Sequence, residues 1–350
     1  MSNPDPTALT QIPFEEEARP HLDDAQLRAY FECIKLPREH LDSIVLKDAT
    51  KVGTKEHGLP FLAALTRYHA CNVPWDNLVL HYSATKRVTL DQKELYAKIV
   101  SRRLGGRCME NNSLFATILR SIGYEVRDCG GRVARAVSPY PEVRRNQSQT
   151  YDGWNHMLNL VLLDDEWYVV DVGMGALGPN MPFPLRDGFE TTSIAPRLIR
   201  LQHRAIKETY ATGRYVAGPG AAPKMWCYDV CYSPSEDAAA NEWTPVYCFA
   251  ETEFLPQDYE VMSWFTSTNP RSFFTQYVIC SKMIMDEEQQ TIVGNIALFK
   301  DTVRETIGAN RKVVKECKTE DDRVQALAEI FNVNLTDEEK KSIPDDKRLA

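Results

Sequence analysis

The 350-residue chain lacks several features that would each place it in a class of protein. It has no run of about 18 apolar residues, so we expect no transmembrane helix. Basic residues are not in excess: 41 Lys and Arg against 49 Asp and Glu give a net charge of −8, which argues against general nucleic acid binding. Residues 1–20 lack the basic start and apolar core of a signal peptide, so we expect a cytoplasmic protein.

The nine cysteines lack the spacing of a metal cluster. No CxxC pair occurs among them, so we expect no metal site. Without a secretion signal their thiols should stay reduced, and most should be buried and unreactive. We therefore expect chemistry from at most one or two of them.

Helical patterns dominate the first part of the chain, and strand patterns follow. Asp23 and Asp24 can start a helix over residues 25–34, and helical apolar spacing recurs over 61–68 and 90–104. Strands are predicted over 124–137, 154–163, 166–172, 226–232, 245–252, 275–285 and 291–299, and a last helix over 320–331. This order predicts an α+β fold with three subdomains.

Two stretches have the composition of connections. Residues 139–150 are polar and predict a loop. Residues 212–224 are rich in glycine, proline and alanine, which indicates an insertion or a linker.

Cys108 follows two glycines and precedes an apolar stripe at helical spacing that ends at Gly123. The sequence therefore predicts Cys108 at a helix N-terminus, where backbone N–H groups and the helix dipole lower the pKa of a thiol. The preceding glycines permit a sharp turn and the close approach of a ligand. The position suits a nucleophile, and it also suits a small buried side chain that begins a helix.

A predicted hairpin supplies a base for this thiol. If residues 164–165 form a two-residue turn, counting back along both strands places Leu158 opposite Asp171. His156 then shares a face with Leu158 and lies diagonally across from Asp171, within side-chain reach. A structural His–Asp pair would give the same pattern, and a one-residue slip in register would separate the two groups.

Cys108, His156 and Asp171 form a candidate catalytic triad. His156 would hold Cys108 as a thiolate–imidazolium pair, and Asp171 would orient the imidazolium. Two competing histidines, His69 and His81, share no predicted face with a buried carboxylate, so we expect surface or packing roles for them.

Five segments resemble, in the same order, motifs of the arylamine N-acetyltransferase family. Residues 105–112 (GGRCMENN) are similar to the family's RGGxCxExN signature. Residues 152–156 (DGWNH) and 170–175 (VDVGMG) resemble its TGxxH and VDxGxG segments. Residues 73–78 (VPWDNL) resemble its PFENL loop, and residues 268–274 (TNPRSFF) resemble its SPxSxF segment. The common order makes the resemblance specific.

The resemblance implies a fold and a reaction. The fold has a helical domain over residues 1–104 with the nucleophile loop and helix at 105–123, a β-barrel-like domain at 124–211 and an α/β lid at 212–350, and its site is papain-like. The reaction is ping-pong acyl transfer, in which Cys108 takes the acyl group of acetyl-CoA as a thioester. An aromatic amine, hydrazine or hydroxylamine then receives it, which detoxifies xenobiotics. We further expect a monomer or weak homo-oligomer, with no nucleic acid or membrane partner.

The matching positions imply further contacts, each of which has packing or turn formation as its alternative. The residues expected along the CoA path are Asp152, Gly153 and Ser272. The residues expected to line the acceptor pocket are Trp75, Val133, Met174 and Phe273. Backbone N–H groups near Cys108, and that of Gly175, would stabilise the oxyanion.

The chain departs from the family pattern at Leu104, Trp75 and Asp76, where Trp75 replaces the loop's phenylalanine. Leu104 replaces the signature's arginine and Asp76 replaces the loop's glutamate, so the ion pair that supports the family's site is changed. The connections at 139–150 and 212–224 look like those of the fungal branch, which implies malonyl-CoA as an alternative donor. Arginine suits a carboxylate, and the candidates to bind the malonyl group are Arg107, Arg132 and Arg271.

Two other functions remain open on these residues. A cysteine amidase or hydrolase would use the same triad without CoA. A binding protein that keeps the fold would not need the chemistry of the triad.

Overall fold

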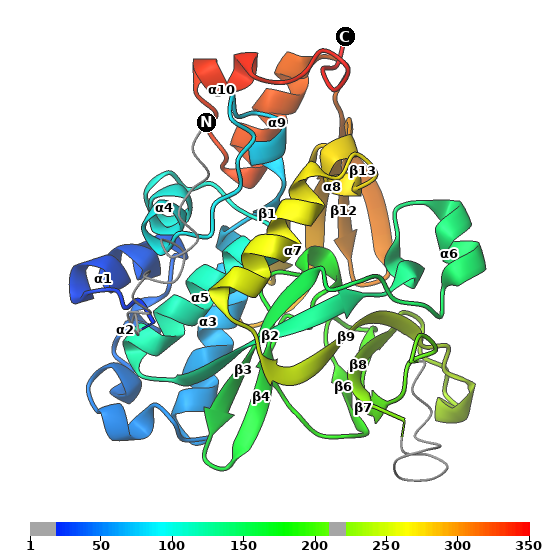
Figure 1. Cartoon of the computed structure of the whole chain (residues 1–350). Helices are drawn as coiled ribbons and strands as arrows, with labels where there is room; N and C mark the ends of the chain where they lie inside the picture. The colour runs from blue at the N-terminus through cyan, green and yellow to red at the C-terminus, as the bar shows by residue number, and fades with distance from the viewer. Residues whose placement is uncertain (1–18, 210–221) are drawn as a thin grey trace, which may run out of the picture.

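The computed structural model describes residues 19–209 and 222–350. Figure 1 shows the blue and cyan N-terminal helices beside the green strands of one sheet. The orange strands of a second sheet and the red C-terminal helices lie above them. The protein therefore has a mixed helix-and-sheet fold. In the described ranges, no helix combines the length and the apolar character that crossing a membrane requires.

The N-terminal helices pack into one hydrophobic core. α1 (Asp24–Cys33) begins at Asp23, whose carboxylate accepts the Gln26 N–H at 2.8 Å. α5 (Cys108–Ile122) ends at Gly123, which takes a φ of 110° that favours glycine. α3 (Gly58–Asn72) supplies side chains to the same core, and Tyr96 of α4 (Gln92–Tyr96) packs against it. The short α2 (Arg38–Leu41) has no buried residue.

An eight-stranded antiparallel sheet follows, in the order β5-β4-β3-β2-β9-β8-β7-β6. Its strands are β2 (Glu125–Val133), β3 (His156–Leu163), β4 (Glu166–Val170), β5 (Phe183–Pro184), β6 (Phe189–Thr192), β7 (Leu198–Arg204), β8 (Met225–Cys231) and β9 (Thr244–Glu253). Along β3, Val161 and Leu163 pack on the helices, while Leu158 and Leu160 join a second core with side chains of β7, β8 and β9. The sheet thus curls around a core of its own, like part of a barrel.

A five-stranded sheet, in the order β1-β10-β11-β12-β13, contains the C-terminal strands. Its strands are β1 (Trp75–Asp76), β10 (Ile279–Met285), β11 (Ile292–Phe299), β12 (Thr302–Ile307) and β13 (Asn310–Glu316). β1 comes from the N-terminal region, so this sheet ties the two ends of the chain together. α9 (Glu320–Phe331) and α10 (Asp337–Lys341) follow the last strand.

Several connections differ from the sequence predictions. The predicted loop at 139–150 contains α6 (Pro141–Gln147), where Pro141 stands in the first helical turn. The helix predicted over 90–104 is shorter, because after α4 the chain makes only a wider π-helical turn that ends at Ser101. α7 (Pro256–Thr268) and α8 (Phe273–Gln276) were not predicted. Most of segment 212–224 lies outside the described residues.

The eight-stranded sheet continues across the predicted domain boundary at residue 212. β8 and β9, which follow that boundary, pair with β7 and β2, which precede it. The division into three domains stays a prediction.

Candidate active site

Cys108 is the first residue of α5. The preceding backbone is extended at Arg107 (φ −81°, ψ −178°), so the thiol lies beside the free N–H groups of the first helical turn. Its side chain is 7% exposed, and its Sγ lies 3.8 Å from the carbonyl oxygen of Asn155. A Cβ on Gly173 would lie 2.6 Å from the Cα of Cys108, so only glycine permits this close approach.

The β3–β4 hairpin has the register that the sequence predicted. Its pairing begins at Leu163 with Glu166, as a two-residue turn requires. Just beyond the paired residues, the Nε2 of His156 lies 2.8 Å from the Oδ2 of Asp171, and both side chains are buried. The predicted proximity of these two groups is confirmed.

Asp171 accepts hydrogen bonds on both carboxylate oxygens. Its Oδ1 accepts the Asn112 Nδ2 at 2.9 Å and the Gly173 N–H at 2.8 Å, while its Oδ2 faces His156. Burial alone would raise the pKa of Asp171, but the charge of His156 and these hydrogen bonds hold it below its ordinary value. The carboxylate is therefore ionised in spite of its burial.

His156 carries the complementary charge. Burial would lower its pKa, but the Asp171 carboxylate, together with the Cys108 thiol, raises it to about 10. The ring of Tyr247 packs on the imidazole with 4.9 Å between centroids. Imidazolium is thus the stable form beside the thiol at neutral pH, which a thiolate–imidazolium pair requires.

The other eight cysteines are buried as well, as expected, and none forms a disulfide. Burial raises the pKa of seven of them, which keeps these thiols protonated and unreactive. They are Cys33, Cys71, Cys129, Cys227, Cys248, Cys280 and Cys317. Cys108 differs from them in contacting an imidazolium.

Arg107 is buried beside the nucleophile, with 3% of its surface exposed. Its guanidinium donates hydrogen bonds to three hydroxyls of α7, on Ser263 at 3.2 Å, Thr266 at 3.0 Å and Ser267 at 2.7 Å. The Oε2 of Glu110 is 3.8 Å from its Nε, which forms no hydrogen bond. The hydrogen bonds of the guanidinium therefore go to neutral acceptors, and its one carboxylate neighbour, Glu110, is too far away to accept one.

The residues expected along the CoA path lie in two loops. The Oδ1 of Asp152 accepts the Arg135 Nε at 2.8 Å, and Gly153 has open space where a Cβ would stand. Ser272 precedes α8, and its N–H donates to the carbonyl of Asn269. In the described ranges, no hydrogen bond joins Ser272 to Asp152 or Gly153.

Of the residues expected in the acceptor pocket, two meet in an aromatic cluster. The ring of Phe274 joins them: its centroid lies 5.8 Å from that of Trp75 and 4.1 Å from that of Phe273. Val133 ends β2, and Met174 packs against the core of the eight-stranded sheet. The structure thus groups Trp75 with Phe273 around Phe274, while Val133 lies at the end of a strand and Met174 in the segment after β4, directly before Gly175, which lies against the Trp75 ring.

Asn112 is a component of the site that the sequence reasoning missed. Besides Asp171, its Nδ2 donates to the carbonyl of Met157, and its Oδ1 accepts the Val172 N–H at 3.0 Å. The available signal was its spacing, because a residue four positions after Cys108 lies on the same face of a helix.

His69 and His81 are both buried, so a packing role holds for them and a surface role does not. His69 shares a hydrogen bond with the Tyr30 hydroxyl at 3.0 Å, and His81 lies 3.0 Å from the carbonyl oxygen of Phe274. Burial lowers the pKa of His69 to about 3 and that of His81 to about 4. Both are therefore neutral.

Comparison with known proteins defines the class of this chain. A family model described as N-acetyltransferase matches residues 58–340, so the chain is an acyltransferase. The N-malonyltransferase FDB2 of Gibberella moniliformis is 67% identical over 348 residues, which are 99% of each chain. The pineal gland arylamine N-acetyltransferase isozyme NAT-10 of Gallus gallus is 25% identical, over 87% of this chain and 97% of its own.

Solved structures agree with the fold. The arylamine N-acetyltransferase of Mycobacterium marinum in complex with CoA has a TM-score of 0.68 at 21% identity and covers 93% of this chain and 100% of its own. That of Mycobacterium abscessus has a TM-score of 0.67 at 22% identity, over 92% of this chain and 94% of its own. The chain belongs to the arylamine N-acetyltransferase family.

Proposed function

We propose that this protein is an arylamine N-malonyltransferase that moves the malonyl group of malonyl-CoA to an aromatic amine through a thioester on Cys108. The observation that carries the choice of donor is the 67% identity, over 99% of both chains, to the N-malonyltransferase FDB2. The structure of the M. marinum relative with CoA supports CoA as the carrier. Acetyl-CoA, the donor expected first from the sequence, is the second candidate.

The geometry supports a mechanism in two acyl transfers. The Cys108 thiolate attacks the thioester carbonyl, and CoA leaves with the proton of the His156 imidazolium. The amine then attacks the Cys108 thioester and gives a proton to His156, and the thiolate is released. Asp171 keeps the imidazole oriented, and the N–H groups of the first turn of α5 stabilise the oxyanion of each step.

We assign the malonyl carboxylate to Arg107, one of the three candidate arginines. It directly precedes the nucleophile and is buried, its hydrogen bonds go to hydroxyls of α7, and its ion pair with Glu110 is long at 3.8 Å. Arg132 instead stacks on Trp154, with its guanidinium 4.3 Å from the centre of the ring. Arg271 is exposed. A bidentate contact with the malonyl carboxylate would give Arg107 charged hydrogen bonds, which neither the hydroxyls nor the distant Glu110 provides.

The proposed function is tested by mixing the protein with malonyl-CoA or acetyl-CoA, each with and without aniline. We expect a malonyl adduct on Cys108 in the intact-mass spectrum, one equivalent of CoA released without aniline, and continued CoA release only with it. Absence of any Cys108 adduct with both donors would contradict the mechanism. CoA release over many turnovers without aniline would instead indicate a hydrolase, and faster turnover of acetyl-CoA would reassign the donor.

The assignment of Arg107 is tested with Arg107→Gln, using Arg271→Gln as the matched exposed control. We expect kcat/KM for malonyl-CoA to fall by about tenfold or more, since a charged hydrogen bond is worth roughly 1.5–3 kcal/mol. Turnover of acetyl-CoA should fall much less. An equal loss with both donors would show that Arg107 acts by holding α7 and not by binding the carboxylate.

A further inference from the structure

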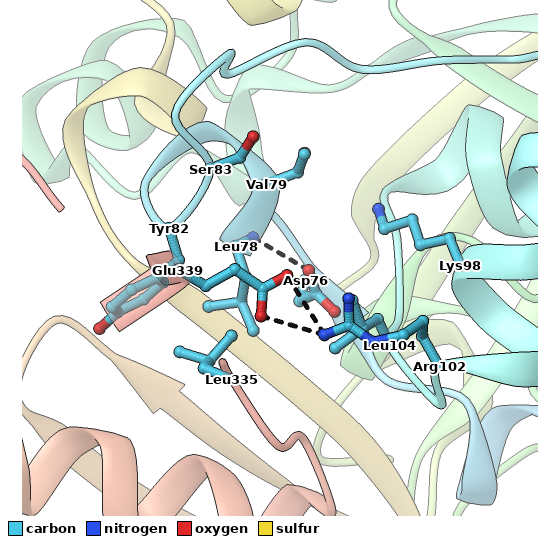
Figure 2. Close-up of a pocket in the computed structure, with 10 residues that line it drawn as sticks. All are labelled: Asp76, Leu78, Val79, Tyr82, Ser83, Lys98, Arg102, Leu104, Leu335 and Glu339. Carbon is cyan, nitrogen blue, oxygen red and sulfur yellow. Dashed lines mark hydrogen bonds and ion pairs between the residues drawn. The ribbon is translucent and has the colours of Figure 1, made fainter. Parts of the chain in front are cut away.

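The nucleophile loop, which leads into α5, lies against a cavity of about 230 Å³. Figure 2 shows Asp76, Lys98 and Leu104 in the wall of this cavity. Leu104 stands where the family signature has an arginine, and Asp76 stands where the family loop has a glutamate. The chain therefore keeps a carboxylate behind the nucleophile loop and lacks the cation that the family pattern supplies at position 104.

Lys98 supplies a cation from the turn before this loop. It lies in the π-helical turn Ala97–Ser101, and such turns are frequent at functional sites. Its Nζ lies 2.6 Å from the Oε1 of Glu110, and the two side chains are 15% and 1% exposed. Its carbonyl oxygen accepts the Leu104 N–H at 3.1 Å. Lys98 thus holds the start of the loop through its backbone and the first turn of α5 through its side chain.

Glu110 connects Lys98 to the nucleophile. It is the third residue of α5, and its Oε2 accepts the Arg107 N–H at 2.9 Å, which caps the helix one residue before Cys108. One carboxylate therefore binds the ammonium group of Lys98 with one oxygen and the backbone of the loop with the other. The position of Arg107, and with it that of Cys108, depends on where Glu110 is held.

The charges around Lys98 support this role. Asp76 and Glu110 are both buried carboxylates. Burial raises the pKa of Asp76 to about 6, and the charge of Lys98 opposes this rise, to which the charge of Glu110 adds. Two other cations lie nearby, but Arg102 pairs with α10, and the guanidinium of Arg107 is 3.8 Å from Glu110 and forms its hydrogen bonds with α7. Lys98 is therefore the cation that faces both carboxylates.

We propose that Lys98 is a positioning residue of the acyl transfer, which sets the place of the Cys108 thiol by holding Glu110. This inference rests on the proposed function, in which Cys108 is the nucleophile. Removal of one partner of a buried ion pair leaves the other charge uncompensated, so without Lys98 the Glu110 carboxylate and the backbone that it caps have to shift. A displacement of about 1 Å at a reacting group can slow a reaction by about 10²-fold.

The test is the rate at which iodoacetamide alkylates Cys108 in the folded, full-length protein, followed by intact-mass spectrometry. Lys98→Met removes the charge at nearly constant length, and we expect alkylation to slow by about tenfold or more. Lys98→Arg keeps the charge and should restore most of the rate, whereas Lys93→Met, at an exposed lysine of α4, should leave the rate unchanged. If Lys98→Met lowers the free energy of unfolding in urea but leaves the alkylation rate of the folded protein unchanged, Lys98 is merely structural and the proposal is overturned.

A double variant tests the partner of Lys98. In a Glu110→Gln background the ion pair is already broken, so Lys98→Met should change the alkylation rate by less than about twofold. Equal slowing in both backgrounds would show that Lys98 acts without Glu110 and would overturn the proposal. Should Lys98→Met fail to fold, Lys98→Gln, which removes the charge and keeps a hydrogen-bond donor, takes its place. Alkylation needs no acyl donor, so failure of this inference is distinct from absence of a Cys108 adduct with malonyl-CoA and acetyl-CoA.

Discussion

Asp171 and Asp76 are two aspartates of nearly equal burial, with 3% and 2% of their surfaces exposed, yet their pKa values shift in opposite directions. Burial raises the pKa of Asp76 to about 6, whereas His156, Asn112 and Gly173 together hold the pKa of Asp171 below its ordinary value. Depth is therefore not what separates them. What separates them is the groups that face each carboxylate: a charged imidazole and two N–H donors compensate the burial of Asp171, whereas the burial of Asp76 is compensated only in part.

The largest expected effect is the loss of activity on neutralising Asp171. Asp171→Asn keeps the shape but removes the charge that stabilises the His156 imidazolium, so acylation of Cys108 should slow by about 10³-fold or more. Single-turnover mixing with malonyl-CoA and mass detection of the adduct measures this. Asp165→Asn is the matched control, and a loss below about tenfold in Asp171→Asn would refute the role given to Asp171.

The second effect is a gain in stability on neutralising Asp76. Asp76 has a raised folded pKa, so the stability it contributes is full below its ordinary value of 3.8 and is lost as pH rises through about 6. This shift corresponds to at most about 3 kcal/mol. Asp76→Asn should therefore unfold at higher urea concentration than the wild type at pH 7.5, with the difference shrinking towards pH 4. A variant that is less stable at pH 7.5 would show that the charge of Asp76 is well compensated.

The third effect tests how tightly the Asp171 region is packed. In Gly173→Ala, the new Cβ would lie 2.4 Å from the Asn112 Nδ2 and 2.6 Å from the Cα of Cys108. We expect a loss of about 1–3 kcal/mol in the free energy of unfolding, together with lower activity. Gly53→Ala, whose Cβ meets nothing within 4 Å, is the control. Equal stability of the two variants would mean that the segment after β4 can move away from α5.

The smallest effect concerns the ion pair between Arg102 and Glu339, two residues that line a cavity beside Asp76. Arg102 and Glu339 are both partly exposed, so their pairing is screened by solvent. Glu339→Gln should change the free energy of unfolding by less than about 1 kcal/mol, as measured by urea denaturation in low salt. A larger loss would mean that this pair holds α10 in its place on the molecule.

The sequence predicted the Asp171 region because its contacts are local. A two-residue turn and the alternation of side chains along a strand were enough to bring His156 to Asp171. Helical spacing could have placed Asn112 on the face of Cys108, but its bond to Asp171, 59 residues away, could not be inferred from that spacing. The catalytic roles of these residues stay predictions that the experiments above address.

The contacts of Arg102 and Arg107 could not be predicted, because they join distant parts of the chain. Arg102 and Glu339 are 237 residues apart in the sequence, and Arg107 and Ser263 are 156 apart. α7, which supplies Ser263, was missed because Trp264 and Phe265 are 69% and 55% exposed. Apolar residues on both faces of a helix obscure the periodicity on which a prediction depends.

The nucleophile loop is, in its hydrogen bonding, an extension of the C-terminal sheet. The Gly106 carbonyl accepts the Asp76 N–H at 3.0 Å, the Gly106 N–H donates to Pro74 at 3.2 Å, and β1 in turn pairs with β10. The signature motif lies in the first third of the sequence, but β1, to which its backbone is hydrogen-bonded, pairs with a strand from the last third. A protein shortened before β10 would keep every residue of the motif and lose the anchor that sets the position of the thiol.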